Sequence, residues 1–204
     1  MANDLINLIP KDAEELATFI EAVQTIRGAS KAAKSAVAKH FGPAFERNWR
    51  RVTEKAKELR DKVAPERHTE PSPSILIPLV DAACQEGGQE LQDLWAALLA
   101  NSMIDGGKKV RREYLEAVRR MEPMDVSVLN IIRLPLPPKN NARDRNDRHD
   151  FHSKKREEFG ITQDEWAVSV KALTGLGCMH DSQMGYEPSV TAFARMLLAA
   201  CEVR

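Results

Sequence analysis

One stretch, residues 90–103, constrains the fold of this chain more than any other. It reads ELQDLWAALLANSM, and its large apolar side chains recur three and four positions apart. This spacing places them on one face of an α-helix. Because such a face is stable only when it packs against other apolar groups, we expect the helix in the protein core. We assign a structural role to the residues of this face: Leu91, Leu94, Trp95, Leu98, Leu99 and Met103.

The composition favours a mainly α fold. Hydrophobic residues make up 43% of the 204 residues, which is enough for a packed core, whereas aromatic residues make up only 5%. Ala, Leu, Glu, Lys and Arg, which are common in helices, are abundant. We therefore expect helices to form the core of the protein.

The charges cancel overall but not locally. The formal net charge is zero, yet residues 27–67 carry +7 and residues 68–107 carry −6. A protein that binds nucleic acid strongly and without sequence preference is usually basic overall. Blocks of opposite sign can instead meet within one chain or across an interface, so we expect self-association or a protein partner.

The cysteines and the N-terminus predict a cytoplasmic protein. Cys84, Cys178 and Cys201 lie far apart and form no CxxC pair, so neither a zinc site nor a disulfide framework is indicated. No apolar run approaches the roughly 20 residues that span a membrane. The first residues lack the basic and continuous apolar regions of a secretory signal. We expect no cofactor.

The N-terminal part reads as a helical arm, residues 1–64, followed by a linker, residues 65–74. Within the arm we expect three helices, and the Phe41-Gly42-Pro43 sequence is expected to end the second. The linker contains three prolines and little apolar content. The expected helices of the arm cover residues 11–27, 30–40 and 44–63.

The C-terminal part, residues 75–204, reads as a helical domain that begins with a hairpin of two helices. Pro78 is expected to open the first helix, and Gly87-Gly88 to separate it from the helix of residues 90–103.

Residues 110–204 resemble a winged helix in their order of elements. Helices are expected at 110–122 and 126–132, and the Thr162 and Glu165 pair matches a capping box that starts a third helix. A small β-hairpin and a last helix follow. The strands of the hairpin are expected at 178–180 and 187–191, and the last helix at 192–201.

Two helices of this part carry specific expectations for their faces. On the capped helix, Gln163, Asp164, Ser169 and Lys171 are expected to point outward. On the last helix, Phe193, Met196, Leu197 and Ala200 are expected to point inward.

Residues 135–158 form a charged segment without an apolar stripe, so we expect a loop insertion. Its basic side chains are candidate contacts for nucleic acid or an acidic partner, although interleaved acids weaken the field. His149 and His152 lie near Asp147 and Asp150, but the spacing lacks helical ligand geometry, so no metal site is predicted. The candidate contacts are Arg143, Arg145, Arg148, Lys154, Lys155 and Arg156.

No set of residues argues for an enzyme. The chain has neither a G-x-S-x-G nucleophile motif nor a glycine-rich phosphate loop. Four acids of the first hairpin could supply paired carboxylates, but nothing marks them as buried, and a solvated acidic face is the favoured interpretation. These acids are Asp81, Glu86, Glu90 and Asp93.

Several motifs between residues 71 and 124 resemble the abortive infection alpha family of bacterial proteins. These motifs are a proline-bearing lead-in at residues 75–79, the E-L-Q-D-L-W-A-x-L-L-A motif at 90–100 and a Pro-x-Asp turn at 123–125. Similar C-terminal features are Leu173-Thr174-Gly175-Leu176-Gly177, Thr191-Ala192-Phe193 and Cys201. The resemblance implies defence against phage and supplies no catalytic motif.

Three function hypotheses follow. The first is a non-enzymatic interaction protein in phage defence that contacts a phage or host component. The second is a nucleic-acid-binding regulator that uses the winged-helix-like part. The third is a membrane-acting effector that uses the basic amphipathic residues 28–63.

Overall fold

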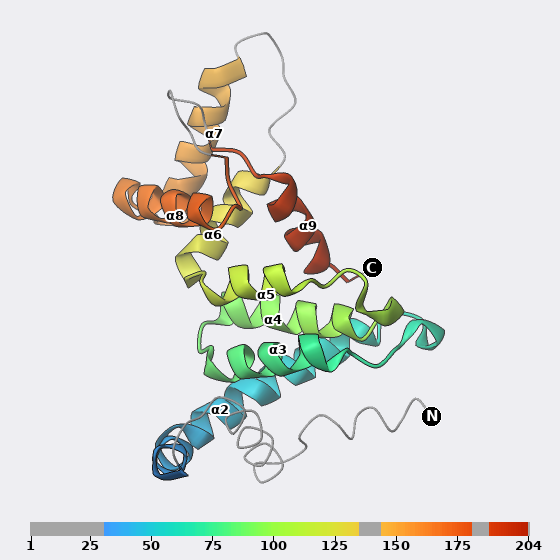
Figure 1. Ribbon diagram of the computed structural model, residues 1–204. Helices are drawn as coiled ribbons and strands as arrows, with labels where there is room; N and C mark the ends of the chain where they lie inside the picture. The colour runs from blue at the N-terminus through green and yellow to red at the C-terminus, as the bar shows by residue number, and fades with distance from the viewer. Residues whose placement is uncertain (1–30, 135–143, 181–187, 204) are drawn as a thin grey trace. The chain divides into compact units, whose positions relative to one another are not determined.

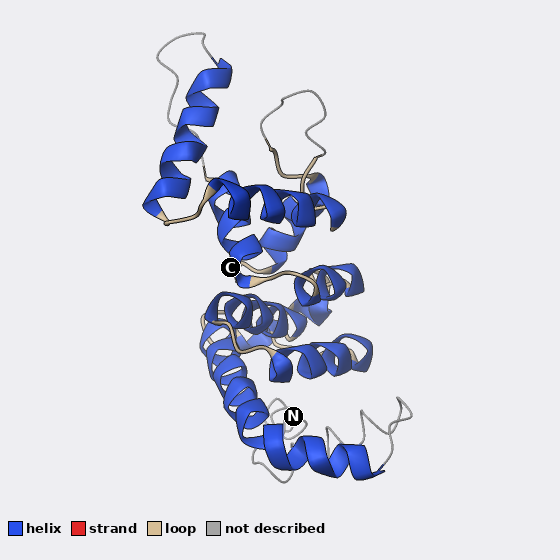
Figure 2. Cartoon of the chain, turned by 90° about the vertical axis from the view of Figure 1, so that its left-hand side faces the viewer, coloured by secondary structure: helices blue, strands red, loops and turns tan. Residues whose placement is uncertain are grey.

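The computed structural model describes residues 31–134, 144–180 and 188–203, and the side chains of residues 43–134, 150–180 and 188–203. Within these ranges the protein is mainly helical (Figure 1, Figure 2). The α-helices are α2 (Lys31–Arg60), α3 (Pro73–Gln85), α4 (Gln89–Ser102), α5 (Arg112–Arg119), α6 (Pro123–Arg133), α7 (Asp144–Glu158), α8 (Gln163–Gly175) and α9 (Ala192–Ala200). Two short 3-10 helices are η2 (Pro65–Arg67) and η3 (Asp105–Gly107).

The chain folds into two compact units. Unit 1 combines residues 1–119 with residues 200–204, and unit 2 consists of residues 120–199. Unit 2 is therefore an insertion between two segments that together form unit 1.

Helix α4 is the centre of unit 1. Helices α2 and α3 both pack against it, and α3 and α4 lie side by side in Figure 1. The apolar stripe predicted from the sequence is confirmed as a core face, because Trp95 and its neighbours are almost fully buried. The buried side chains of the stripe are Leu91, Trp95, Leu98, Leu99 and Met103, while Leu94 is half-buried.

Helix α2 differs from the sequence prediction, because Lys31–Arg60 forms one helix where two were expected. The helix passes through Phe41-Gly42-Pro43 with Pro43 inside it. Proline removes one backbone donor, but the remaining turns of a long helix keep their hydrogen bonds. Packing of Trp49, Val52 and Ala56 into the core of unit 1 supports the second half of α2.

The first hairpin begins earlier than the sequence suggests. Helix α3 starts at Pro73, which occupies its first turn, and Pro78 lies inside the helix. A proline at the first helical position loses nothing, because its backbone nitrogen would have no partner there. The expectation that Pro78 opens the helix is therefore wrong by about one turn.

In unit 2, helix α6 packs against both α7 and α8. The predicted capping box of α8 is confirmed. The Thr162 hydroxyl accepts a hydrogen bond from the Glu165 backbone nitrogen at 3.3 Å, and the Thr162 nitrogen donates to Glu165 Oε2 at 2.8 Å. The Thr162 nitrogen and the Thr162 hydroxyl, which donates to the same carboxylate oxygen at 2.7 Å, hold the pKa of Glu165 below its ordinary value.

Residues 144–158 form helix α7 where the sequence predicts a loop. The segment lacks an apolar stripe, so hydrophobic periodicity alone misses the helix. His152 is buried, and its ring lies 6.1 Å from the ring of Trp166 on α8. An ion pair between Lys155 and Glu158, three residues apart, adds local support.

Several finer expectations change. Residues 179 and 190 form one isolated antiparallel bridge, and the described ranges contain no sheet. On α8, Ser169 is buried rather than outward, and on α9, Met196 is 53% exposed rather than inward. The local sequence does not decide these positions, because tertiary packing determines which side chains of a helix are covered. The helix predicted at 11–27 lies outside the described residues.

Candidate functional site

Helix α4 carries three buried polar side chains in addition to its apolar face, and two of them, Gln92 and Asn101, are amides. Gln92 and Asn101 are each 1% exposed. A buried amide is costly unless its donors and acceptor find partners. The hydrogen-bond partners of these two amides therefore show which segments of the chain α4 joins.

Gln92 joins three segments of unit 1. Its Nε2 donates to the Glu86 carbonyl at 2.6 Å, and its Oε1 accepts from Arg51 Nη1 at 3.1 Å. The Glu86 carboxylate in turn accepts from the Gly88 nitrogen at 2.6 Å. Gln92 thus fixes α4 to the turn after α3 and to α2.

Asn101 joins the end of α4 to the last described residues. Its Nδ2 donates to the Ala200 carbonyl at 2.9 Å, with further contacts to the Ala97 carbonyl at 3.2 Å and the Glu202 carbonyl at 3.4 Å. Ala200 and Glu202 belong to unit 1. The amide therefore closes unit 1 across 99 positions of the sequence.

The four acids singled out in the sequence do not converge on one site. The Asp81 carboxylate pairs with Arg119 at 2.8 Å, and the Asp93 carboxylate pairs with Lys55. The Glu86 carboxylate accepts from the Gly88 nitrogen just before α4, and Glu90 is exposed. These carboxylates serve structural pairs on different elements rather than one paired-carboxylate centre.

The basic candidates of residues 143–156 fall on α7 or just before it. Arg143 and the side chains of Arg145 and Arg148 lie outside the described residues. Lys154 is exposed. The Lys155 ammonium lies 2.6 Å from Glu158, and this contact holds the pKa of the Glu158 carboxyl below its ordinary value. Arg156 is half-buried, and its Nε has no hydrogen-bond partner among the described atoms.

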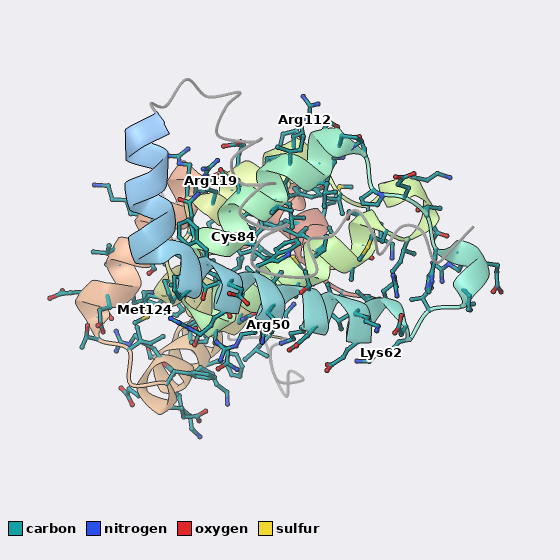
Figure 3. The ribbon with its side chains drawn as sticks, turned by 90° about the horizontal axis from the view of Figure 1, so that it is seen from below. Arg50, Lys62, Cys84, Arg112, Arg119 and Met124 are labelled. Carbon is teal, nitrogen blue, oxygen red and sulfur yellow. The ribbon has the colours of Figure 1, made fainter. Side chains whose placement is uncertain are left out.

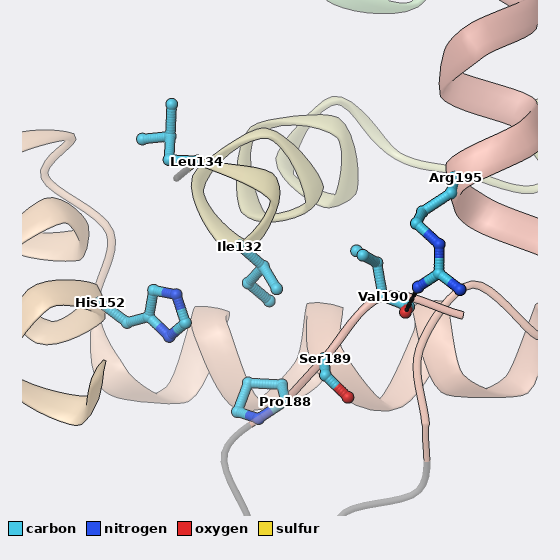
Figure 4. Close-up of a pocket in the computed structure, with 7 residues that line it drawn as sticks. All are labelled: Ile132, Leu134, His152, Pro188, Ser189, Val190 and Arg195. Atoms are coloured by element: carbon cyan, nitrogen blue, oxygen red, sulfur yellow. Dashed lines mark hydrogen bonds between the residues drawn. The ribbon is translucent and has the colours of Figure 1, made fainter. Parts of the chain in front are cut away.

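A cavity of about 290 Å³ lies in unit 2 (Figure 4). The buried His152 forms one wall and faces Ile132 and Pro188 in the close-up. Arg195 lies at the other side, where its Nη1 donates to the Val190 carbonyl at 2.9 Å. The seven lining residues are Ile132, Leu134, His152, Pro188, Ser189, Val190 and Arg195. They come from three distant segments, so no local pattern in the sequence could have revealed the cavity.

No group of three or more potential metal ligands occurs within the described ranges. The side chains of Asp147 and His149, which the sequence places near His152 and Asp150, lie outside these ranges. No described helix is both long enough and apolar enough to cross a membrane.

The sequence analysis passed over a second basic cluster, the 108–112 patch, which we define as Lys108, Lys109, Arg111 and Arg112. All four side chains are exposed in unit 1. The signal was present in the sequence as KKVRR, a run without an acid. Acids that follow the run reduce the net charge of residues 108–132 to +2, so the average over a longer segment hides it.

The three cysteines lie in the described residues, form no disulfide and differ in their burial. Burial, with a smaller effect of Asp81, raises the pKa of the Cys84 thiol to about 12. Burial, with a smaller effect of Asp125, raises the pKa of the Cys178 thiol to about 11. Cys201 is partly exposed.

We expect one fast-reacting thiol in the native protein at pH 8, and that thiol is Cys201. Thiolates react and buried thiols stay protonated, so Cys84 and Cys178 should react only after unfolding. Titration with a disulfide reagent, with and without urea, measures the number of thiols. The variant Cys201→Ser should lose the fast phase, and fast modification of Cys84 in the folded protein would contradict the burial of α3.

These observations define a mainly helical protein of two compact units. In unit 1 the buried amides of Gln92 and Asn101 on α4 form hydrogen bonds to other segments. The family model for abortive infection alpha matches residues 45–201, which is more than half of the chain. The chain therefore belongs to the abortive infection alpha family. No curated protein and no solved structure matches the chain.

Proposed function

We propose that this protein acts in bacterial defence against phage, of the abortive infection type, through contact with a phage or host component rather than through catalysis. The observation that carries the proposal is the family match over residues 45–201. The matched segment includes the α4 motif, whose large side chains build the core of unit 1. This role leaves the charged and apolar surfaces of the protein to make the functional contacts.

The exposed apolar side chains of unit 2 support a protein partner or self-association. Phe159, Val168 and Met196 are between 53% and 68% exposed. Large apolar groups that stay in solvent are common where proteins meet other proteins. A phage protein, a host protein or a second copy of this chain could cover them.

The nucleic-acid regulator is the second proposed function, with the winged-helix-like part as its binding module. The bridge between Met179 and Val190, placed between α8 and α9, supports this topology. The first turn of α8 counts against groove insertion of this helix, because Asp164 and Glu165 would face phosphates. We therefore rank the nucleic-acid regulator below the protein-contact hypothesis.

The membrane hypothesis receives less support from α2. The apolar side chains of its second half, Trp49, Val52 and Ala56, pack inside unit 1 and do not form an open face. A helix that lies on a membrane needs such a face for insertion. We propose instead that the protein acts in the cytoplasm, where the reduced state of its three free cysteines would be maintained.

A phage challenge tests the proposed function. Bacteria that express the full chain should survive as a culture at a low phage-to-cell ratio and collapse at a high ratio. A strain that expresses Trp95→Ala, in which the core of unit 1 is disrupted, should behave like an empty-vector strain. Immunoblots would confirm that the native chain is present at the time of infection.

Two results would count against the proposal. Survival of the culture at the high ratio would indicate a defence that does not kill the infected cell. Failure to protect against a varied phage panel would show that the chain alone does not provide defence.

A further inference from the structure

The 108–112 patch sits on an ordered part of unit 1. It follows η3, where Gly106 and Gly107 have φ values of 73° and 68° that favour glycine. A Cβ at Gly107 would lie 3.0 Å from the Ser102 carbonyl oxygen, so the turn runs close against the end of α4. The buried Val110 side chain then anchors the middle of the patch.

A second segment holds the same turn. Arg67 and Asp105 form a bidentate pair, with Nη2 2.6 Å from Oδ2 and Nε 3.1 Å from Oδ1. The Gly106 nitrogen donates to the Thr69 hydroxyl at 2.8 Å. The patch is therefore presented from a fixed backbone.

The charges of the patch serve no ion pair in the described part of the chain. Elsewhere the protein pairs basic side chains with acids, as in Arg119 with Asp81 and Lys55 with Asp93. The nearest acid before the patch, Asp105, forms its ion pair with Arg67, and Lys108 and Lys109 attract it only from beyond ion-pair distance. Glu113 and Glu116 follow on α5 and are exposed.

The position of the patch is also unfavourable for the stability of helix α5. Its four cations lie before and at the start of α5, whose two ends are labelled by Arg112 and Arg119 in Figure 3. The N-terminus of a helix carries a partial positive charge and favours acids. Four cations at this end are unfavourable for the helix, which points to a role outside the fold.

We propose that the 108–112 patch binds the phosphate backbone of nucleic acid without reading its sequence. Lys108 and Lys109 lie in a turn and Arg112 begins α5, so the four cations are close together in the chain. Duplex DNA presents one charge per roughly 1.7 Å of its axis. The four cations can therefore face several phosphates at once. The inference deepens the proposed function and rests on it in one respect, since it names nucleic acid as the class of partner that the protein contacts.

The composition of the patch favours nucleic acid over a membrane. Val110, its one large apolar residue, is buried, and the large hydrophobic side chains that are exposed in the described ranges all lie in residues 120–199. Binding at the patch would therefore be electrostatic, with no apolar insertion into lipid. A phosphate backbone matches this requirement because cations alone can neutralise it.

Fluorescence anisotropy with the purified full chain tests the inference. The probes are a labelled 20-base-pair duplex and a labelled 20-nucleotide single strand, titrated at 50, 100 and 200 mM KCl. With about four phosphate contacts, affinity for the duplex should fall about 100-fold between 50 and 200 mM salt. The combined variant Lys108→Gln, Lys109→Gln, Arg111→Gln and Arg112→Gln should bind at least tenfold more weakly at 50 mM and lose most of the salt dependence.

A matched variant removes the same charge from another surface of unit 1. It replaces the exposed residues Arg47, Arg50, Lys57 and Lys62, on α2 and just after it, with glutamine. This variant should keep at least half of the wild-type affinity, and circular dichroism should show that both variants remain folded. An equal loss of affinity in the two variants would overturn the inference, because net charge rather than the patch would then control binding.

Three further outcomes would overturn the inference. The first is no binding of either probe at 50 mM salt. The second is binding to vesicles of phosphatidylcholine and phosphatidylglycerol without binding to the probes. The third is loss of binding on replacement of Lys154, Lys155 and Arg156 alone, which would place the site in unit 2.

The phage challenge separates this inference from the proposed function. If the combined patch variant fails to bind nucleic acid but still protects cells, the defence function stands and the patch is not its contact. If the wild-type chain binds through the patch but does not protect, the binding site stands and the proposed function fails.

Discussion

Replacing Trp95 with alanine is expected to lower the free energy of unfolding by about 3–5 kcal/mol. The Trp95 side chain is 1% exposed and lies in the middle of α4, against which both α2 and α3 pack. Removal of the indole ring leaves a cavity that rigid helices fill only in part. A loss of this size approaches the whole stability of a typical domain, so unit 1 should be largely unfolded at 37 °C.

Urea unfolding followed by circular dichroism measures the effect without relying on tryptophan fluorescence. Phe159→Ala is the matched control, because this aromatic side chain is 62% exposed and should change stability by about 0.5 kcal/mol or less. If the two variants unfold at the same urea concentration, Trp95 does not occupy the core position that the structure gives it.

Replacing Asn101 should destabilise unit 1 through its polar contacts. Asn101→Leu keeps a similar volume but removes the donor to the Ala200 and Glu202 carbonyls, and we expect a loss of about 1–3 kcal/mol. Asn101→Asp should cost about 3 kcal/mol or more at pH 7, because it places a carboxylate among carbonyl oxygens. The residues after α9 should then become accessible to carboxypeptidase.

The Asn101→Asp variant also predicts a direction for the pH dependence. Burial and the facing carbonyls would raise the pKa of the introduced carboxyl in the folded state above the ordinary value of about 4. The folded state then binds the proton more strongly, so stability should fall as the pH rises from 4 towards 7. Asn130→Leu, a half-buried control on α6, should show a loss of about 0.5 kcal/mol or less and no such pH dependence. A pH-independent Asn101→Asp variant would contradict the buried position of this side chain.

The elements that the sequence predicted well are those with a strong local signal. The α4 stripe repeats apolar residues over more than three turns, and the α8 capping box uses two side chains three positions apart. In each case neighbouring residues alone supply the physical reason for the element. The family resemblance rested on the same α4 motif, and the match over residues 45–201 confirms it.

The elements that the sequence missed depend on distant contacts. Helix α2 continues through Pro43 while its second half packs against α3 and α4, which no local rule anticipates. Helix α7 shows no apolar stripe, and its buried His152 meets Trp166 of α8. The roles of Ser169 and Met196 were reversed for the same reason, since only tertiary packing decides which side of a short helix is covered.

The candidate site was less predictable than the fold. The sequence pointed to Arg143, Arg145, Arg148, Lys154, Lys155 and Arg156, of which the structure describes the last three side chains. The 108–112 patch has a plain signal, but only the structure shows that its four cations are exposed while Val110 is buried. A charged group can contact a partner only if it stays exposed after folding and forms no ion pair within the protein. The sequence alone does not show which groups meet these conditions.

The bond between Asn101 and Ala200 also sets an order of events during protein synthesis. The Asn101 amide can form this hydrogen bond only after Ala200, 99 positions later in the chain, has been synthesised. At about 5–20 residues per second, the ribosome needs roughly 5–20 seconds to add that distance. During this interval the residues of unit 2 are synthesised while unit 1 still lacks its last segment. A nascent chain stalled before residue 200 should therefore carry an incomplete unit 1, open to proteases and chaperones at the end of α4.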